Sequence, residues 1–285
     1  MLPSNIKFSY LLAFPITLCL FAAIYITYSG GSQYALWIAP FVVALVVIYL
    51  LSPQIDWWWY QRNPPDIHEP MRIFLQQHHK FYQQLSVAQK QKFRERMALY
   101  IEANEFIQKG FGDEESTVPH GIRGIIAANA VYLTFGKDDF LMNKFEHIIV
   151  YPQQFPSPQF PRQFHSSEIF VEDGVIMFSA EHLMSSFTHP QQYYNIGLHE
   201  YAQVFMLSAP HYPYPQMDEH IWQHLEAISG MSKDYIHRYI NLPDIPPLPV
   251  SIHHFFQFPV QMQQILPELY QTYTNIFKIT PQQSY

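Results

Sequence analysis

Apolar residues are concentrated in two long runs near the start of the chain. No charged residue occurs in residues 10–28 or in residues 35–51, and each run is close to the length that a helix needs to cross the core of a bilayer. The linking residues 29–34 are polar and include two adjacent glycines, as is typical of a tight turn. The pattern predicts a transmembrane hairpin with helices over about 10–28 and 35–51. A buried helical hairpin inside a globular core is the alternative.

The charges that flank these runs predict their orientation. Lys7 precedes the first run, Arg62 and Arg72 follow the second, and the link carries no charge. Positively charged residues favour the cytoplasmic side, so we expect both chain ends there, at an inner or plasma membrane. The aromatic residues 57–60 follow the second run directly and suit the headgroup layer.

After Pro64 and Pro65 the chain acquires the helical spacing and polar faces of a soluble protein. We therefore expect a membrane anchor over residues 1–63 and a soluble domain over 64–285. Ser86 with Gln89 matches a capping box, which predicts a long amphipathic helix from there to Gln108. A buried helix is expected over 122–135 and a strand over 145–151.

The second half of the domain combines one hairpin with further helices. Two apolar stretches within residues 168–179 flank Asp173 and Gly174, a pair that suits a two-residue hairpin turn. Helices are expected over 193–208, 218–229 and 232–240, then a proline-rich loop over 242–250 and one or two final helices. The fold class predicted is α+β and mostly α.

Composition excludes several classes of function. The 285 residues carry 16 basic and 23 acidic side chains, a net charge of −7, and no basic stripe, which gives nucleic-acid binding little support. The single cysteine, Cys19, lies in an apolar run and excludes both an internal disulfide and a cysteine-based zinc ribbon.

One motif combines residues of catalytic type. A zincin metal site needs two histidines four residues apart on one helix face, with a glutamate after the first as general base. Here His199 and Glu200 are present, but Gln203 stands where the second histidine is required. Taken alone, H-E-x-x-Q is a weak signal and is more typical of a buried helix that has a polar stripe.

The surrounding sequence resembles the Mlc titration factor A family of zinc-dependent peptidases over most of residues 80–280. The similar segments occur in the family's order and spacing, and they are residues 85–106, 122–136, 147–155, 174–179, 194–206, 253–259 and 266–271. The resemblance implies a zincin-like metallopeptidase domain with a small sheet, which the predicted transmembrane hairpin precedes.

In that family the helix reads H-E-x-A-H, and a glutamate from a later helix completes the zinc site. By position, His199 corresponds to the first ligand, Glu200 to the general base and Gln203 to the second ligand. An ungapped match of residues 251–259 to the later helix places His253 at the third ligand. The resemblance therefore implies that two of three metal ligands are altered.

These changes leave two hypotheses for zinc. An amide oxygen is a poorer zinc ligand than imidazole, and no anionic ligand is left, so the site is expected to bind zinc weakly or not at all. Alternatively, His199 and His253 form a rearranged site that Gln203 or His254 completes. His253 and His254 also suit ordinary polar positions at a helix start.

The leading hypothesis is a membrane-anchored, catalytically degenerate relative that binds a peptide or protein. Zincins hold extended substrates against an edge strand, for which residues 175–179 are the candidate, and such a groove can outlast catalysis. The alternative is an active metallopeptidase with a His/Gln/His site and Glu200 as base. The resemblance also suggests a transcriptional regulator as the protein partner.

Overall fold

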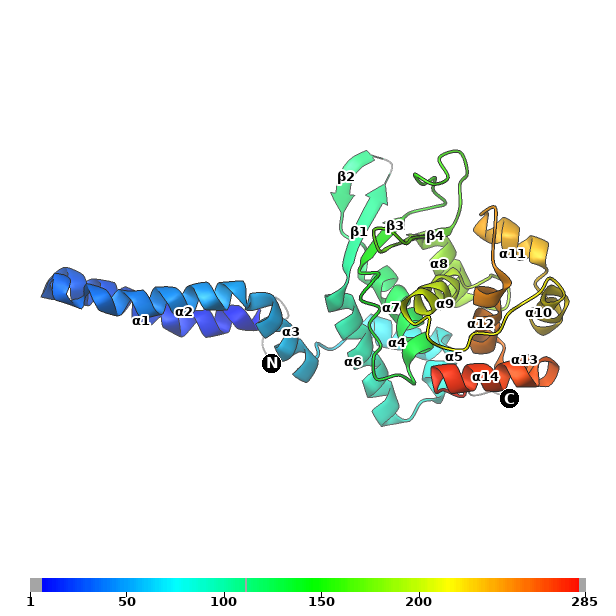
Figure 1. Ribbon diagram of the computed structural model, residues 1–285, viewed down its shortest axis with the longest axis horizontal. Helices are drawn as coiled ribbons and strands as arrows, with labels where there is room; N and C mark the ends of the chain where they lie inside the picture. Colours follow the sequence, from blue (N-terminus) through cyan, green and yellow to red (C-terminus); the bar gives the residue numbers. More distant parts are fainter. Residues whose placement is uncertain (1–6, 111, 282–285) are drawn as a thin grey trace. The chain divides into compact units, whose positions relative to one another are not determined.

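The computed structural model describes residues 7–110 and 112–281. The chain divides into two compact units, Met1–Pro65 and Asp66–Tyr285. The outermost residues of the predicted anchor and soluble domain, 1–6 and 282–285, lie outside the described part. Figure 1 shows the helices and strands of each unit.

The described residues of the first unit are almost all helical. It contains α1 (Phe8–Gly30), the 3₁₀ helix η1 (Ser32–Trp37), α2 (Ile38–Leu50) and α3 (Ser52–Arg62). Two helical spans, Phe8–Gly30 and Gln33–Leu50, are long and apolar enough to cross a membrane, and almost none of their residues are buried within the protein. Gly31 has a φ of 105°, which glycine adopts readily, and it separates the two spans.

A polar contact joins the two ends of this unit. Asp56 in α3 accepts hydrogen bonds from the Ser9 backbone N–H at 2.8 Å and from the Ser9 hydroxyl at 2.9 Å. Beside them, Phe8 stacks on Trp59 with ring centroids 4.2 Å apart. The carboxylate therefore caps orphan donors in the first turn of α1 and fastens α3 to it.

The second unit combines eleven α-helices with five strands in its described part. In chain order the elements are α4 (Glu69–His78), α5 (Lys80–Gln84), α6 (Val87–Ala103), β1 (Glu105–Gly110), β2 (Gly112–Ser116), α7 (His120–Thr134), β3 (His147–Tyr151), β4 (Ser167–Phe170), β5 (Val175–Ser179), α8 (Ala180–Thr188), α9 (Ile196–Ser208), α10 (Ile221–Ser229), α11 (Lys233–Ile240), α12 (Pro247–Gln257), α13 (Pro259–Ile265) and α14 (Pro267–Phe277). The predicted α+β, mostly α class is confirmed.

Helix α6 begins as its sequence predicts and ends earlier. Ser86 and Gln89 form the reciprocal capping box. The expected continuation to Gln108 is wrong, because residues 105–108 belong to β1 and pair in parallel with His147 to Val150 of β3. Similarly, α12 begins at Pro247, inside the segment expected to be a loop.

The sheet is mixed, with strand order β2-β1-β3-β5-β4. Strands β1, β3 and β5 are parallel, whereas β2 and β4 pair antiparallel with their neighbours. The predicted β4–β5 hairpin is confirmed, but its turn is longer than two residues, since Phe170 pairs with Val175 across residues 171–174. Gly174 has a φ of 63°, and a Cβ there would lie 2.2 Å from the Lys144 carbonyl oxygen.

The core lies around two buried helices. Helix α7 packs against both α6 and α9, and α9 in turn contacts β4, β5 and α12. From Gly124 to Thr134 every α7 side chain is buried, as its near absence of charge predicts. In Figure 1, helices α10–α14 lie on the opposite side of α9 from α6. This arrangement places α9 at the centre of the second unit.

Candidate functional site

The H-E-x-x-Q motif lies in the buried helix α9. Asn195 caps this helix by accepting a hydrogen bond from the Leu198 N–H at 3.1 Å, so α9 begins at Ile196 and not at 193 as expected. The Asn195 amide also donates to Asn129 Oδ1 of α7 at 3.0 Å. A Cβ at Gly197 would lie 2.4 Å from Asn129 Nδ2. Glycine therefore permits the close approach of α9 to α7.

His199 is enclosed, with 2% of its surface exposed. Its Nδ1 lies 2.8 Å from the Tyr194 hydroxyl, and its Nε2 lies 3.0 Å from the Gln203 amide nitrogen. An amide nitrogen only donates, so Nε2 accepts this hydrogen bond and Nδ1 carries the ring proton. Burial lowers the pKa of His199 to about 3, so the ring is neutral at pH 7.

Glu200 is completely buried. One carboxyl oxygen accepts a hydrogen bond from the Ser167 hydroxyl at 2.6 Å, and the other accepts one from the Gln203 amide at 2.9 Å. Burial raises the pKa of Glu200 to about 8, the Ser167 hydrogen bond partly opposes this rise, and the charge of Glu168 adds to it. A carboxyl group with this pKa mostly retains its proton at pH 7.

Gln203 connects the two residues that precede it in the motif. Its amide nitrogen carries two hydrogens, and one hydrogen bond goes to His199 Nε2 while the other goes to Glu200 Oε2. The result is one chain of hydrogen bonds from Ser167 in β4, through the motif, to Tyr194. Gln203 thus occupies the lone pair of the nitrogen with which a zincin histidine binds its metal.

Helix α12 places His253 and His254 in the same interior, and both are buried. His253 Nε2 accepts a hydrogen bond from the Asn195 backbone N–H at 3.3 Å, and its Nδ1 lies 3.2 Å from His254 Nδ1. The Tyr194 ring lies 4.2 Å from the His253 ring. Burial, then the neighbouring histidines His254 and His199, lower the pKa of His253 well below its ordinary value.

Comparison with known proteins identifies the family of this domain. The model of the glucose-regulated metallopeptidase family M90 matches residues 55–278. The chain belongs to this M90 family. The match begins inside α3 and ends one residue beyond α14. It confirms the resemblance to the Mlc titration factor A family. A comparison with curated proteins gave no match.

The residues of this M90 domain do not fit a zincin zinc site. His199 Nε2 is engaged by the Gln203 amide, and His253 Nε2 is engaged by the Asn195 backbone. Within residues 7–110 and 112–281, no group of three or more His, Cys, Asp or Glu side chains is arranged to hold a metal ion. His254 also has both ring nitrogens engaged, with the Val250 carbonyl at 2.7 Å and the Ser229 hydroxyl at 2.9 Å.

The structure brings three of the four predicted site residues into one hydrogen-bonded group, and His253 is the fourth. His199, Glu200 and Gln203 form one hydrogen-bonded group, whereas Tyr194 makes the contacts that link His199 to His253. Sequence reasoning missed Ser167 and Tyr194. Ser167 lies 33 residues before its partner Glu200, and no local pattern indicates that pairing.

The proposed substrate-binding strand also needs correction. Residues 175–179 form β5, which pairs with β3 on one side and β4 on the other, so it is not an edge strand. The edge beside α9 is β4, the strand that supplies Ser167. An alternating apolar pattern shows that a strand is half-buried but does not give its place in the sheet.

Proposed function

We propose that this chain is a membrane-anchored M90 domain whose metal site is catalytically degenerate and which acts by binding a peptide or protein segment. The observation that carries the proposal is the position of the Gln203 amide nitrogen, 3.0 Å from His199 Nε2 and 2.9 Å from Glu200 Oε2. Membership of a metallopeptidase family implies that an ancestor of this domain had metal-dependent chemistry. The two hydrogen bonds of the Gln203 amide support the loss of that chemistry in this chain.

The Gln203 amide satisfies the groups that a metal and its water would otherwise engage. Zinc binding through His199 would require both hydrogen bonds of this amide to break, and the replacement ligand would be a weak neutral oxygen. The raised pKa of Glu200, about 8, also opposes its use as a general base, because the base must be ionised to accept a proton from water.

Anchoring in a membrane is supported by the two apolar helical spans Phe8–Gly30 and Gln33–Leu50. We propose that they insert as a hairpin, and that the positive charges of Lys7, Arg62 and Arg72 retain the M90 domain on the cytoplasmic side. The functional boundary is proposed near residue 64, where the helical anchor ends.

The binding surface we propose is the outer edge of β4. The Ser179 N–H donates to the Ser166 carbonyl, so alternation along an antiparallel pair turns the backbone groups of Ser167 and Ile169 away from β5. Ser167 is completely buried, so the partly exposed Ile169 is the residue with which we expect an extended peptide to pair as an added strand. The Ser166 N–H, which donates to the Ile240 carbonyl at 2.9 Å, sets one end of the available edge.

The test uses the full-length protein in detergent with a library of fluorescent decapeptides, and it measures binding by anisotropy and cleavage by mass spectrometry. We expect binding without cleavage, unchanged in the Glu200→Gln variant. Ile169→Pro removes the outward N–H and should abolish binding, whereas Ile169→Val keeps that group and should retain it. Peptide cleavage that depends on Glu200 would support an active peptidase instead, and equal binding by both Ile169 variants would exclude the β4 edge.

A further inference from the structure

A cavity lies at the start of α9, and its lining includes Leu198 but none of His199, Glu200 and Gln203. It is bounded by α5, α7, the segment before α9, and the junction of α12 and α13, and its volume is about 150 Å³. Apolar rings and side chains form much of its wall, namely those of Phe81, Tyr132, Phe187, Phe258 and Val260. A cavity of roughly this volume accommodates a benzene-sized ring.

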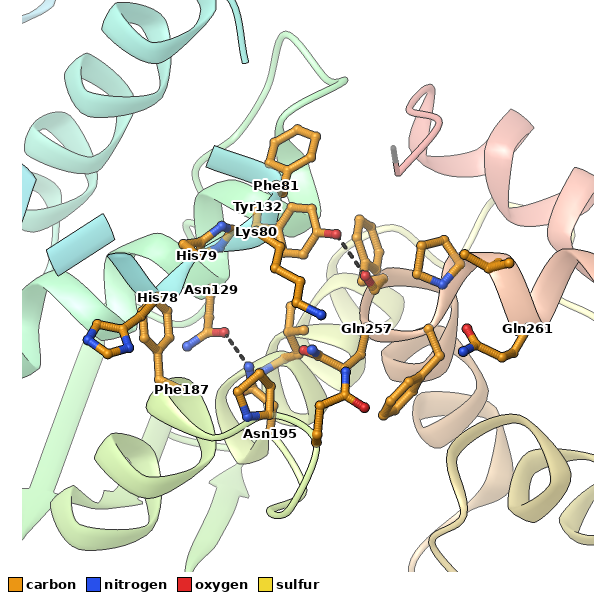
Figure 2. Close-up of a pocket in the computed structure, with 17 residues that line it drawn as sticks. His78, His79, Lys80, Phe81, Asn129, Tyr132, Phe187, Asn195, Gln257 and Gln261 are labelled. Carbon is orange, nitrogen blue, oxygen red and sulfur yellow. Dashed lines mark hydrogen bonds between the residues drawn. The ribbon is translucent and has the colours of Figure 1, made fainter. Parts of the chain in front are cut away.

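The charged residues that line this cavity are basic and not acidic. Figure 2 shows the Lys80 side chain extending from α5 toward the middle of the lining residues. The 17 described residues that line the cavity include no Asp and no Glu.

Lys80 is available to a ligand. It is exposed and has no hydrogen-bond or ion-pair partner within the part of the chain that the structure describes. Gln257, at the end of α12, also lines the cavity and likewise has an amide without a partner among the described residues. An ammonium and an amide donor in a cavity whose wall is partly apolar match a carboxylate on a compact apolar body.

Several of the neighbouring polar groups are already engaged within the protein. Asn129 and Asn195 hydrogen-bond to each other at 3.0 Å, and Tyr132 donates to the Phe256 carbonyl at 2.7 Å. His79 Nδ1 accepts from the Tyr82 N–H, and burial lowers the pKa of His79 to about 4, so this ring is neutral. Lys80 is the only Lys or Arg side chain among the described residues that line the cavity.

We propose that this cavity binds a small organic carboxylate with an apolar body, held by Lys80 and Gln257. The site is separate from the H-E-x-x-Q network and does not depend on the proposed function. Both a free carboxylic acid and the C-terminal residue of a peptide carry a carboxylate on an apolar body. An experiment can distinguish these two ligands.

The test is calorimetric titration of the full-length protein in detergent with benzoate and with benzamide, its uncharged analogue. We expect benzoate to bind about tenfold more tightly than benzamide, because a hydrogen bond to a charged group is stronger than one to a neutral group. Lys80→Met should remove this preference. Lys144→Gln removes the same charge from an exposed position outside the lining and should leave it intact.

A second variant tests the cavity without changing its charge. Val260→Trp should fill the space and abolish benzoate binding while circular dichroism stays that of the unmodified protein. Acetyl-Gly-Gly-Phe, tested with a free C-terminal carboxylate and as its amide, distinguishes the two sources. If the acid form of the peptide binds, the ligand is the C-terminal residue of a peptide. If the protein binds benzoate but not this peptide, the ligand is a free carboxylic acid. Equal affinity for benzoate in the unmodified and Lys80→Met proteins, or no benzoate binding at all, would overturn the proposal.

Discussion

Replacing Gln203 by leucine tests whether its amide holds the buried motif together. The substitution removes both hydrogens that His199 Nε2 and Glu200 Oε2 accept, at 3.0 and 2.9 Å, and it keeps a side chain of similar volume. His199 and Glu200 are 2% and 0% exposed, so water does not readily replace the lost donor.

The magnitude follows from these two orphaned acceptors. A buried polar group left without a partner costs about 1–3 kcal/mol, and two such groups therefore cost roughly 2–6 kcal/mol. Gln203 is half-buried, so the leucine recovers about 1 kcal/mol through apolar burial. We expect the free energy of unfolding to fall by about 1–5 kcal/mol.

The assay is urea unfolding of the full-length protein in detergent, followed by circular dichroism. Gln153→Leu is the matched control, because Gln153 is an exposed glutamine of the same domain, and this variant should change the free energy of unfolding by less than about 0.5 kcal/mol. A Gln203→Leu protein as stable as this control would refute the bridging role of the amide.

Three further predictions follow from other contacts. The pKa of Glu200 is about 8 in the folded state against an ordinary value of 4.5, so the folded state binds more protons than the unfolded state between these values. The free energy of unfolding should therefore fall as pH rises from 4.5 to 8. Glu200→Gln should remove this loss of stability when unfolding is measured between about pH 6.5 and 8. Gly197→Ala should destabilise the protein by about 1–3 kcal/mol through the clash with Asn129, whereas Gly121→Ala, where a Cβ meets open space, should not, as thermal melting will show. Carbonate extraction should leave the chain in the membrane pellet, and a cysteine placed near the C-terminus should stay unlabelled by impermeant reagents in intact cells; release or labelling would exclude the proposed topology.

The sequence predicted those elements whose formation depends on residues that are close together in the chain. The Ser86 capping box, the uncharged helix α7 and the β4–β5 hairpin are each specified by residues close in sequence. The end of α6 is not, because residues 105–108 form a strand only through parallel pairing with β3. Likewise, the place of β5 inside the sheet depends on β3 and β4 together.

The same distinction applies to the site. His199, Glu200 and Gln203 are adjacent on one helix, so their spacing alone predicted that they would meet. Ser167 and Tyr194 contact them through tertiary packing, which no spacing rule gives. His253 was placed at a ligand position by an ungapped family match, and its contacts are with Asn195, His254 and the Tyr194 ring.

We propose that Gln203 has replaced zinc chemistry in this M90 domain, and the zinc content of the full-length protein tests this proposal most directly. The protein is loaded with excess zinc, separated by gel filtration in detergent and measured by elemental mass spectrometry, beside a Gln203→His, His253→Glu double variant that restores the family ligands. We expect about one zinc per chain in the double variant and far less in the unmodified protein. Stoichiometric zinc in the unmodified protein, with peptide cleavage that is lost in Glu200→Gln, would contradict the account.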